Sequence, residues 1–247
     1  MLMLQRQEVG SALPADRLRS PAPHHRTVIS SAFDGLKDMT TFLNITMSLD
    51  GFVAGPNQTL EEPLGEGGEQ LHEWIVGLKS WRAQHGHEGG ESNADADLVR
   101  ETNERTGSFV MGRRMFSGGS GAWEDDPKAN GWWGDDPPFN GPVFVVTHHE
   151  REPLVLGSTT YTFVDGIEEA IRQAREAGGD KDVQICGGGS VAQQALNAGL
   201  LDELHIHVAP QVLGGGVRLF ESADPGTLEL VRAVESPHVA HLTYRVR

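Results

Sequence analysis

The sequence predicts a three-layer α/β/α domain with a mostly parallel central sheet and an antiparallel edge at its C-terminus. Strand-like and helix-like segments alternate from Thr41 to Leu219, and such alternation is typical of a parallel sheet covered by helices on both faces. Two further strand-like segments, 228–234 and 238–246, then follow one another without a helix between them. We expect these two segments to form a hairpin at one edge of the sheet.

The composition argues against several kinds of binding partner and indicates the cellular compartment. The 247 residues carry a formal net charge of −15, which opposes binding to nucleic acid or to an anionic membrane surface. No apolar run approaches the ~20 residues that cross a bilayer. The single cysteine, Cys186, excludes internal disulfides and cysteine-based zinc sites, and the histidines show no metal-ligand spacing. We therefore expect a cytoplasmic protein with no metal, no nucleic-acid partner and no membrane partner.

Residues 1–38 differ from the rest of the chain. They contain proline, serine, arginine and histidine without sustained periodicity, which predicts a disordered leader. Met39 directly precedes the first strand-like segment and is a candidate natural start. Because no repeat and no linker interrupts the remainder, we expect one folded domain over residues 39–247.

The first structured segments are two short strands joined by a turn. Residues 41–48 alternate apolar and polar side chains, as a strand with two unlike faces does. Asp50-Gly51 is a typical turn pair, and a second extended piece ends near Pro56. Two roles remain open for Asp50, namely turn formation and contact with a ligand.

Two helices are predicted before the next strand. Apolar residues recur at three- and four-residue steps near residues 69–81 and give that helix one apolar face. A second helix should run from an N-cap at Asn93 to a stop at Gly107. Two aspartates, Asp95 and Asp97, lie in its first turn, where the helix dipole favours them.

A pair of arginines follows the next predicted strand. Residues 108–111 are apolar enough to be buried, and Gly112-Arg113-Arg114 comes directly after them. Two guanidinium groups at one strand end suit a phosphate, but ordinary surface arginines explain the pair equally well. Residues 117–141 contain several aspartates and tryptophans and predict a long loop that is anchored by its aromatic side chains.

The second half of the domain repeats the strand–helix pattern. Strands are expected at 143–147, 161–164, 183–186 and 201–210, and helices at 166–178 and 190–198. Gly187, Gly188 and Gly189 form the turn before the helix that Ser190 would cap. Free N–H groups at such a helix start form an anion site. The alternative is a tight connection that binds nothing.

Four segments in a fixed order carry a resemblance to a known family. They are Met47-Ser48-Leu49-Asp50-Gly51, Phe109-Val110-Met111-Gly112-Arg113-Arg114, Ile185-Cys186-Gly187-Gly188-Gly189-Ser190, and Leu201-Asp202-Glu203-Leu204 with Pro210, Leu213-Gly214-Gly215-Gly216 and Leu219-Phe220. Each motif alone is weak, but their order over residues 41–246 is specific. The chain resembles the dihydrofolate reductase-like superfamily, and most closely the reductase domain of bacterial bifunctional riboflavin deaminase-reductases. The resemblance implies the fold of that superfamily.

The resemblance also implies NADPH as the cofactor and a homodimer, since relatives pair through their sheets. The residues that it assigns to the cofactor are Gly112, Arg113 and Arg114 at the phosphates, Thr147 and His148 along the adenosine, and Gly187, Gly188, Gly189 and Ser190 at the pyrophosphate. The arginines would favour NADPH over NADH.

The implied reaction is hydride transfer to a C=N or C=O bond of a small heterocyclic or sugar–pyrimidine substrate. It would be similar to the reduction catalysed by 5-amino-6-(5-phosphoribosylamino)uracil reductase. The alternatives are a dihydrofolate reductase proper and a non-catalytic NADPH-binding protein on the same fold.

A proton must also reach the substrate. In folate reductases a carboxylate on the helix before the second motif serves this step, and alignment of that motif places Ala96 there, between two aspartates. Ala96 therefore opposes strict dihydrofolate reductase activity. Asp97, Asp50 and His207 are the candidate catalytic residues, although His207 could equally be an ordinary residue of its strand.

Overall fold

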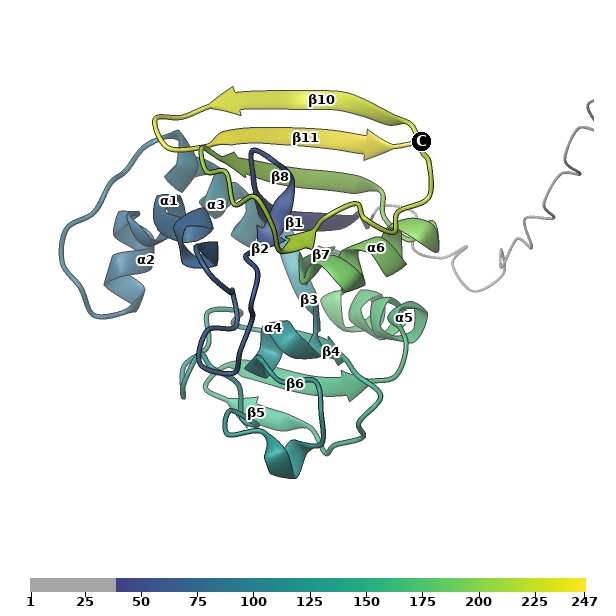
Figure 1. Cartoon of the computed structure of the whole chain (residues 1–247). Helices are drawn as coiled ribbons and strands as arrows, with labels where there is room; N and C mark the ends of the chain where they lie inside the picture. Colours follow the sequence, from purple (N-terminus) through teal and green to yellow (C-terminus); the bar gives the residue numbers. More distant parts are fainter. Residues whose placement is uncertain (1–38) are drawn as a thin grey trace, which may run out of the picture. The chain divides into compact units, whose positions relative to one another are not determined.

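A nine-stranded mixed sheet lies at the centre of the computed structural model, which describes residues 39–247 (Figure 1). The predicted leader, residues 1–38, lies outside the described residues. The strand order is β10-β11-β8-β1-β7-β3-β4-β6-β5. The strands of this sheet are β1 (Thr41–Ser48), β3 (Thr106–Gly112), β4 (Pro142–Val146), β5 (Leu154–Leu156), β6 (Thr159–Val164), β7 (Asp182–Gly187), β8 (Glu203–Ala209), β10 (Leu228–Glu235) and β11 (Ala240–Val246).

The sheet is parallel in its centre and antiparallel at both edges. All strands from β8 to β6 in the spatial order are parallel to one another. The hairpin of β10 and β11 is antiparallel to β8 and confirms the predicted C-terminal edge. The second antiparallel edge, β5, was not predicted. Its three residues are too few to show the alternation that indicates a strand.

Helices cover both faces of the sheet, which gives the predicted three layers. On one face α5 (Ile167–Gly178) and α6 (Gly189–Asn197) pack on β3 and β7. The side chains of β1 alternate between the layers. Leu43 and Ile45 belong to the core beneath α5 and α6. Thr46, on the opposite face, accepts a hydrogen bond from Trp74 Nε1 of α1 (Glu73–Val76).

The predicted helix near residues 69–81 is broken in the structure, so one continuous helix was wrong. The segment forms a 3₁₀ turn η1 (Gly68–His72), α1, and α2 (Lys79–Gln84). The backbone is extended at Leu78, whose side chain is buried. The apolar spacing that indicates a helix continues across this interruption, and the sequence therefore conceals it.

Helix α3 (Ala94–Arg105) begins as predicted, because the Asn93 side chain accepts hydrogen bonds from the backbone N–H groups of Asp95 and Ala96. It ends before the predicted stop at Gly107, since Thr106 already belongs to β3. Arg105 pairs with Asp182, the first residue of β7. The end of α3 therefore lies at the amino ends of the parallel strands, and its first turn points toward their carboxyl ends.

The remaining elements are short. The helix α4 (Arg113–Ser117), not predicted from sequence, follows β3 directly, and the 3₁₀ turn η2 (Trp123–Asp125) lies in the predicted long loop. Trp123 packs against Phe116 and Phe163, which confirms an anchoring role. Strands β2 (Phe52–Ala54) and β9 (Val217–Arg218) form a separate small sheet. No helix within residues 39–247 is long and apolar enough to cross a bilayer.

Candidate active site at the carboxyl edge of the sheet

The carboxyl ends of the parallel strands meet at one edge of the sheet, where open α/β sheets commonly bind ligands. Three neighbouring strands, β7, β3 and β4, end there. The segments predicted to bind the cofactor follow these strands and are Gly187–Ser190 after β7, Gly112–Arg114 after β3, and Thr147 with His148 after β4. The fold therefore brings segments that are far apart in sequence to adjacent positions on one edge.

Two of these segments touch through their backbones. A Cβ atom added to Gly112 would lie 2.9 Å from Val191 Cγ2 and 3.6 Å from the backbone nitrogen of Gly188. Gly187 has a φ of 125°, which favours glycine, and the Gly187–Gly188 peptide bond is cis. A Cβ on Gly188 would meet nothing within 4 Å. The backbone at Gly188 is therefore open to an approaching molecule.

Helix α6 starts directly after this turn. Gly188 is its N-cap and Gly189 its first residue, so the prediction that Ser190 caps the helix was wrong. Ser190 lies inside the first turn, where its exposed Oγ accepts a hydrogen bond from Gln194 at 3.1 Å. No side chain caps α6. Its first N–H groups are consequently available to an anion.

The two predicted arginines have different surroundings. Arg113 is 7% exposed, pairs with Asp126 at 2.6 Å, and lies 3.6 Å from the centroid of the Trp123 ring. Burial lowers the pKa of Arg113, and the hydrogen bond and charge of Asp126 oppose that shift. Arg114 is exposed and lines a hollow of about 300 Å³. The guanidinium of Arg114 is therefore the one available to a bound anion.

Thr147 and His148 differ in the same way. Thr147 is buried, and its Oγ1 accepts a hydrogen bond from the backbone N–H of His149 at 3.1 Å. His148 is exposed and lies 2.6 Å from Asp165, which follows β6. Thr147 thus orders the turn after β4, while the exposed His148 ring, paired with Asp165, lies on the outside of that turn.

The carboxylate of Asp50 holds a loop in place. It accepts hydrogen bonds from Ser48 Oγ at 2.6 Å and from the backbone N–H groups of Leu213 at 3.1 Å and Gly214 at 2.7 Å. The Ser48 bond, helped by the backbone bonds, lowers the pKa of Asp50 to about 2. A carboxylate that stays ionised near neutral pH does not donate a proton. The geometry therefore gives Asp50 a role in fixing the glycine-rich loop next to β1.

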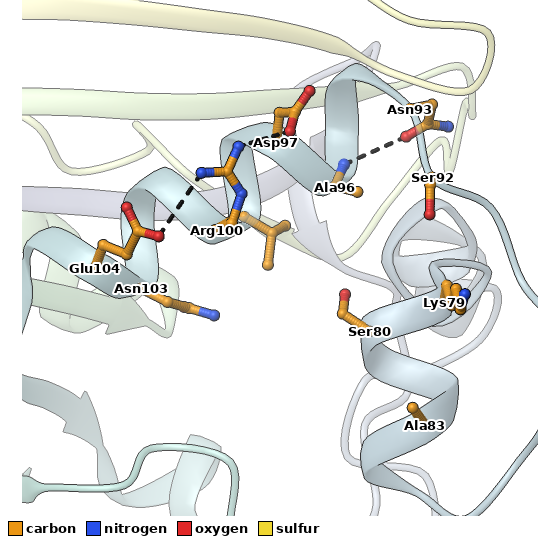
Figure 2. A pocket seen from close by; sticks show the side chains of 11 residues that line it. Lys79, Ser80, Ala83, Ser92, Asn93, Ala96, Asp97, Arg100, Asn103 and Glu104 are labelled. Carbon is orange, nitrogen blue, oxygen red and sulfur yellow. Dashed lines mark hydrogen bonds and ion pairs between the residues drawn. The ribbon is translucent and has the colours of Figure 1, made fainter.

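A groove of about 790 Å³ separates α2 from α3 and contains Asp97 (Figure 2). Asp97 pairs with Arg100 at 2.7 Å, and Arg100 also pairs with Glu104 at 3.7 Å. The side chain of Asp97 is 74% exposed. Ala96 lines the same groove. Asp97 therefore lies on the solvent side of α3, already neutralised by an arginine.

A chain of polar side chains lies between α3 and the sheet. Asp95 Oδ1 is 2.8 Å from His241 Nε2, His241 Nδ1 is 2.7 Å from His207 Nδ1, and His207 Nε2 is 2.7 Å from Asn44 Oδ1. Asp95 and His241 are fully or almost fully buried. We call these four residues the buried polar chain. Of the two aspartates in the first turn of α3, Asp95 faces the sheet and Asp97 faces solvent.

Trp74 covers the two histidines of this chain. Its ring centroid lies 4.9 Å from that of His207 and 5.3 Å from that of His241. Burial, reinforced by the charges of His241 and His205, lowers the pKa of His207 to about 3. His207 is therefore neutral near neutral pH, with one N–H to donate and one nitrogen to accept.

The strand register places His207 at the level of the glycine turn. Thr46 of β1 pairs with His207. The register of β1 with β7 makes Ile45 level with Gly187, and a Cβ on Gly187 would lie 3.4 Å from Ile45 Cδ1. Only β1 lies between β7 and β8, so the two sites are about 10 Å apart across two strand spacings.

Sequence reasoning missed Asp95, His241, Asn44 and Trp74 as members of this site. The signal in the sequence was the alternation of side chains along two predicted strands. His205 and His207 lie two residues apart on one strand and therefore on one face of the sheet, and His241 on the other strand adds a third polar side chain to that face. Although two histidines and an aspartate converge here, the part of the chain that the structure describes holds no group of three or more side chains suited to a metal ion.

Residues 40–242 match the sequence profile of the RibD C-terminal domain. The chain belongs to the RibD C-terminal domain family. RibD C-terminal domains are reductase domains, so the resemblance seen in the four sequence motifs is confirmed, and the chain is of an enzyme family.

Solved structures agree with this RibD-type fold. A Shewanella sp. PV-4 protein assigned to riboflavin biosynthesis shares 24% identity at a TM-score of 0.58, with 85% of this chain and 99% of that chain covered. The Thermotoga maritima diaminohydroxyphosphoribosylaminopyrimidine deaminase/5-amino-6-(5-phosphoribosylamino)uracil reductase shares 14% identity at a TM-score of 0.51, with 87% of this chain and 59% of that chain covered. No curated protein sequence matches significantly.

Proposed function

We propose that this protein is an NADPH-dependent reductase that transfers a hydride to a C=N or C=O bond of a small heterocyclic or sugar–pyrimidine substrate. The observation that carries the proposal is the open glycine turn at Gly188, which lies between the uncapped start of α6 and the strand end at Gly112. The Thermotoga maritima neighbour, named as a 5-amino-6-(5-phosphoribosylamino)uracil reductase, supports the substrate class.

The residues at this edge fit a dinucleotide with phosphate groups. The Gly188 backbone and the first N–H groups of α6 would bind the pyrophosphate. Exposed Arg114 would bind a further phosphate and favour NADPH over NADH. Arg113, the preceding residue, would hold this part of the chain in place through its ion pair with Asp126. When bound, the cofactor supplies the hydride, while the protein binds and orients it.

We place the substrate in the α2–α3 groove. Its volume of about 790 Å³ is in the range of small-molecule sites. The first turn of α3, which lines the groove, points toward the carboxyl edge of the sheet. Lys79, Ser80 and Asn103 line its walls with polar groups, and Ala83 lies among them (Figure 2). Val99 also lines the groove. This combination suits a planar or sugar-bearing polar molecule.

We also propose a homodimer formed through the edge strand β10. Leu228, Leu230 and Val231 of this strand are 39%, 55% and 46% exposed, and an uncovered apolar edge strand is a natural pairing surface. Leu230→Lys should convert the dimer to a monomer in light scattering, and a monomeric wild-type protein would refute the dimer.

The function is tested by cofactor binding and turnover. We expect NADPH to bind, with NADH at least about tenfold weaker, in a fluorescence titration of the full chain. NADPH should then be oxidised when 5-amino-6-(5-phosphoribosylamino)uracil is added. Absence of NADPH binding would refute the proposal. Binding without oxidation of NADPH by any pyrimidine or pteridine substrate would instead favour a non-catalytic nucleotide-binding protein.

A further inference from the structure

Helix α2 stands apart from the layers of the domain. None of the residues Lys79–Gln84 is buried, whereas α1, directly before it, packs Trp74 on the sheet, where that side chain is 6% exposed. The groove of about 790 Å³ separates α2 from α3. Helix α2 is therefore attached to the domain by its ends and not by a packed face.

Both ends of the segment that contains α2 meet at one point. The Lys79 N–H donates to Glu91 O at 2.8 Å, and the Glu91 N–H donates to Gly77 O at 3.0 Å. Leu78 lies between these bonds, and its side chain is 1% exposed. Residues 79–91, which we call the α2 flap, therefore leave the domain and return to it at a neck that Leu78 anchors in the core.

The α2 flap holds its own shape. Arg82 Nε donates to Glu88 O at 3.0 Å, and the His87 N–H donates to Arg82 O at 2.8 Å. The rings of Trp81 and His85 stack with their centroids 4.4 Å apart. These contacts all lie within the flap, so none of them breaks when the flap moves as one body about its neck.

The neck also carries the polar side-chain contacts of the flap with the rest of the domain. Within residues 39–247, every side-chain hydrogen bond between the flap and the remaining residues involves Glu91, which contacts Asn93 at 3.0 Å and His238 at 3.3 Å. Segments with few buried contacts open at a small cost in free energy, and hinges are formed by a few residues at the ends of elements. Leu78, whose backbone is extended between α1 and α2, is at such a position.

We propose that the α2 flap is a lid that closes onto α3 when the substrate enters the groove between them. The inference rests on the proposed function, which places the substrate in this groove. Figure 2 shows Ser80 and Ala83 of the flap on one wall and Ala96 and Asn103 of α3 on the other. In the open groove the substrate is surrounded by water, and closure of the flap removes that water before the hydride is transferred.

Hydrogen exchange followed by mass spectrometry tests the flap in the full chain. Without ligand we expect peptides within 79–91 to exchange at least about tenfold faster than peptides within α3, because α2 has no buried residue. Addition of 5-amino-6-(5-phosphoribosylamino)uracil with NADP⁺, which carries no hydride, should slow this exchange at least about tenfold. The effect should include residues 85–87, which lie in the flap but do not line the groove. Exchange as slow as that of α3 without ligand, or unchanged exchange over 85–87 in the substrate-saturated protein, would overturn the proposal.

A pair of introduced cysteines tests closure. The native Cys186 is buried and is the single cysteine of the chain, so Ser80→Cys with Asn103→Cys adds the accessible thiols. A disulfide forms only when the two Cα atoms come within about 7 Å, and it therefore holds the flap against α3. We expect oxidation before addition of the substrate to stop turnover, and reduction to restore it. Oxidation in the presence of the substrate and NADP⁺ should retain the substrate through gel filtration.

Gln84→Cys with Asn103→Cys is the matched control, because Gln84 belongs to α2 but does not line the groove. This pair should stay reduced under the same conditions. Absence of the disulfide between positions 80 and 103, or loss of the substrate from the oxidised protein, would overturn the proposal. If the wild-type chain binds no NADPH at all, the proposed function fails, and the ligand-free exchange and the disulfide still decide whether the flap closes onto α3.

Discussion

Two aspartates in one helical turn should differ sharply in their effect on stability. Asp95 is completely buried and contacts His241, which is 5% exposed. Removal of one partner of such a buried hydrogen bond leaves the other polar group unsatisfied, which costs about 1–3 kcal/mol. The side chains of Asp97 and Arg100 are 74% and 62% exposed, and such a surface pair contributes about 0–1 kcal/mol. Both aspartates lie in the first turn of α3, so their helix-dipole contributions largely cancel in the comparison.

Urea unfolding followed by circular dichroism measures this difference. We expect Asp95→Ala to lower the free energy of unfolding by about 1–3 kcal/mol, which is a midpoint shift of about 0.5–1 M at an m-value of about 2–3 kcal/mol/M. Asp97→Ala should shift the midpoint by less than about 0.5 M. Equal shifts for the two variants would refute the assignment of Asp95 to the buried polar chain, and a larger shift for Asp97→Ala would reverse it.

Three further predictions concern acid stability, the arginines and the groove. The pKa of His207 is lowered to about 3, so between about pH 6.5 and pH 3 the unfolded chain binds a proton at this residue and the folded chain does not, and stability falls as the pH drops through this range. His207→Gln should flatten this part of a series of melting temperatures measured against pH, and an unchanged slope would contradict the burial of a neutral imidazole. Arg114→Ala should weaken NADPH binding at least about tenfold with little change in melting temperature. Arg113→Ala leaves the buried carboxylate of Asp126 without its partner and should therefore lower the free energy of unfolding by about 3–5 kcal/mol; the reverse pattern would exchange the roles of the two arginines. Ala83→Trp should fill the α2–α3 groove and raise KM for the pyrimidine substrate while the Kd for NADPH stays the same, and an unchanged KM would place the substrate elsewhere.

The fold was largely predictable because its signals are local. Alternation over residues 41–48, the apolar face of residues 166–178 and the glycine turn after residue 186 each lie within about a dozen residues. The order of these elements then limits the topology. Short elements such as β5 and α4 escaped because a single helical turn or three strand residues show no period.

The site was less predictable because its decisive contacts are not local. His207 and His241 meet only through the register of β8 with β11, across 34 positions of sequence. Arg113 is buried because Asp126 folds back from a loop. Asp95 and Asp97 could not be separated because α3 has few apolar residues, and the sequence therefore does not show which side of the helix faces the sheet.

The central claim is that the open glycine turn binds NADPH, and Gly188→Val tests it most directly. A Cβ at Gly188 meets nothing within 4 Å, so the added side chain should occupy the space in front of the turn without disturbing the core. Gly226→Val, before β10 and with only Asp224 O at 4.0 Å from the new Cβ, is the matched control. We expect Gly188→Val to weaken NADPH binding by at least about 10²-fold in a fluorescence titration, with Gly226→Val equal to the wild type. Unchanged NADPH affinity in a folded Gly188→Val protein would contradict the account.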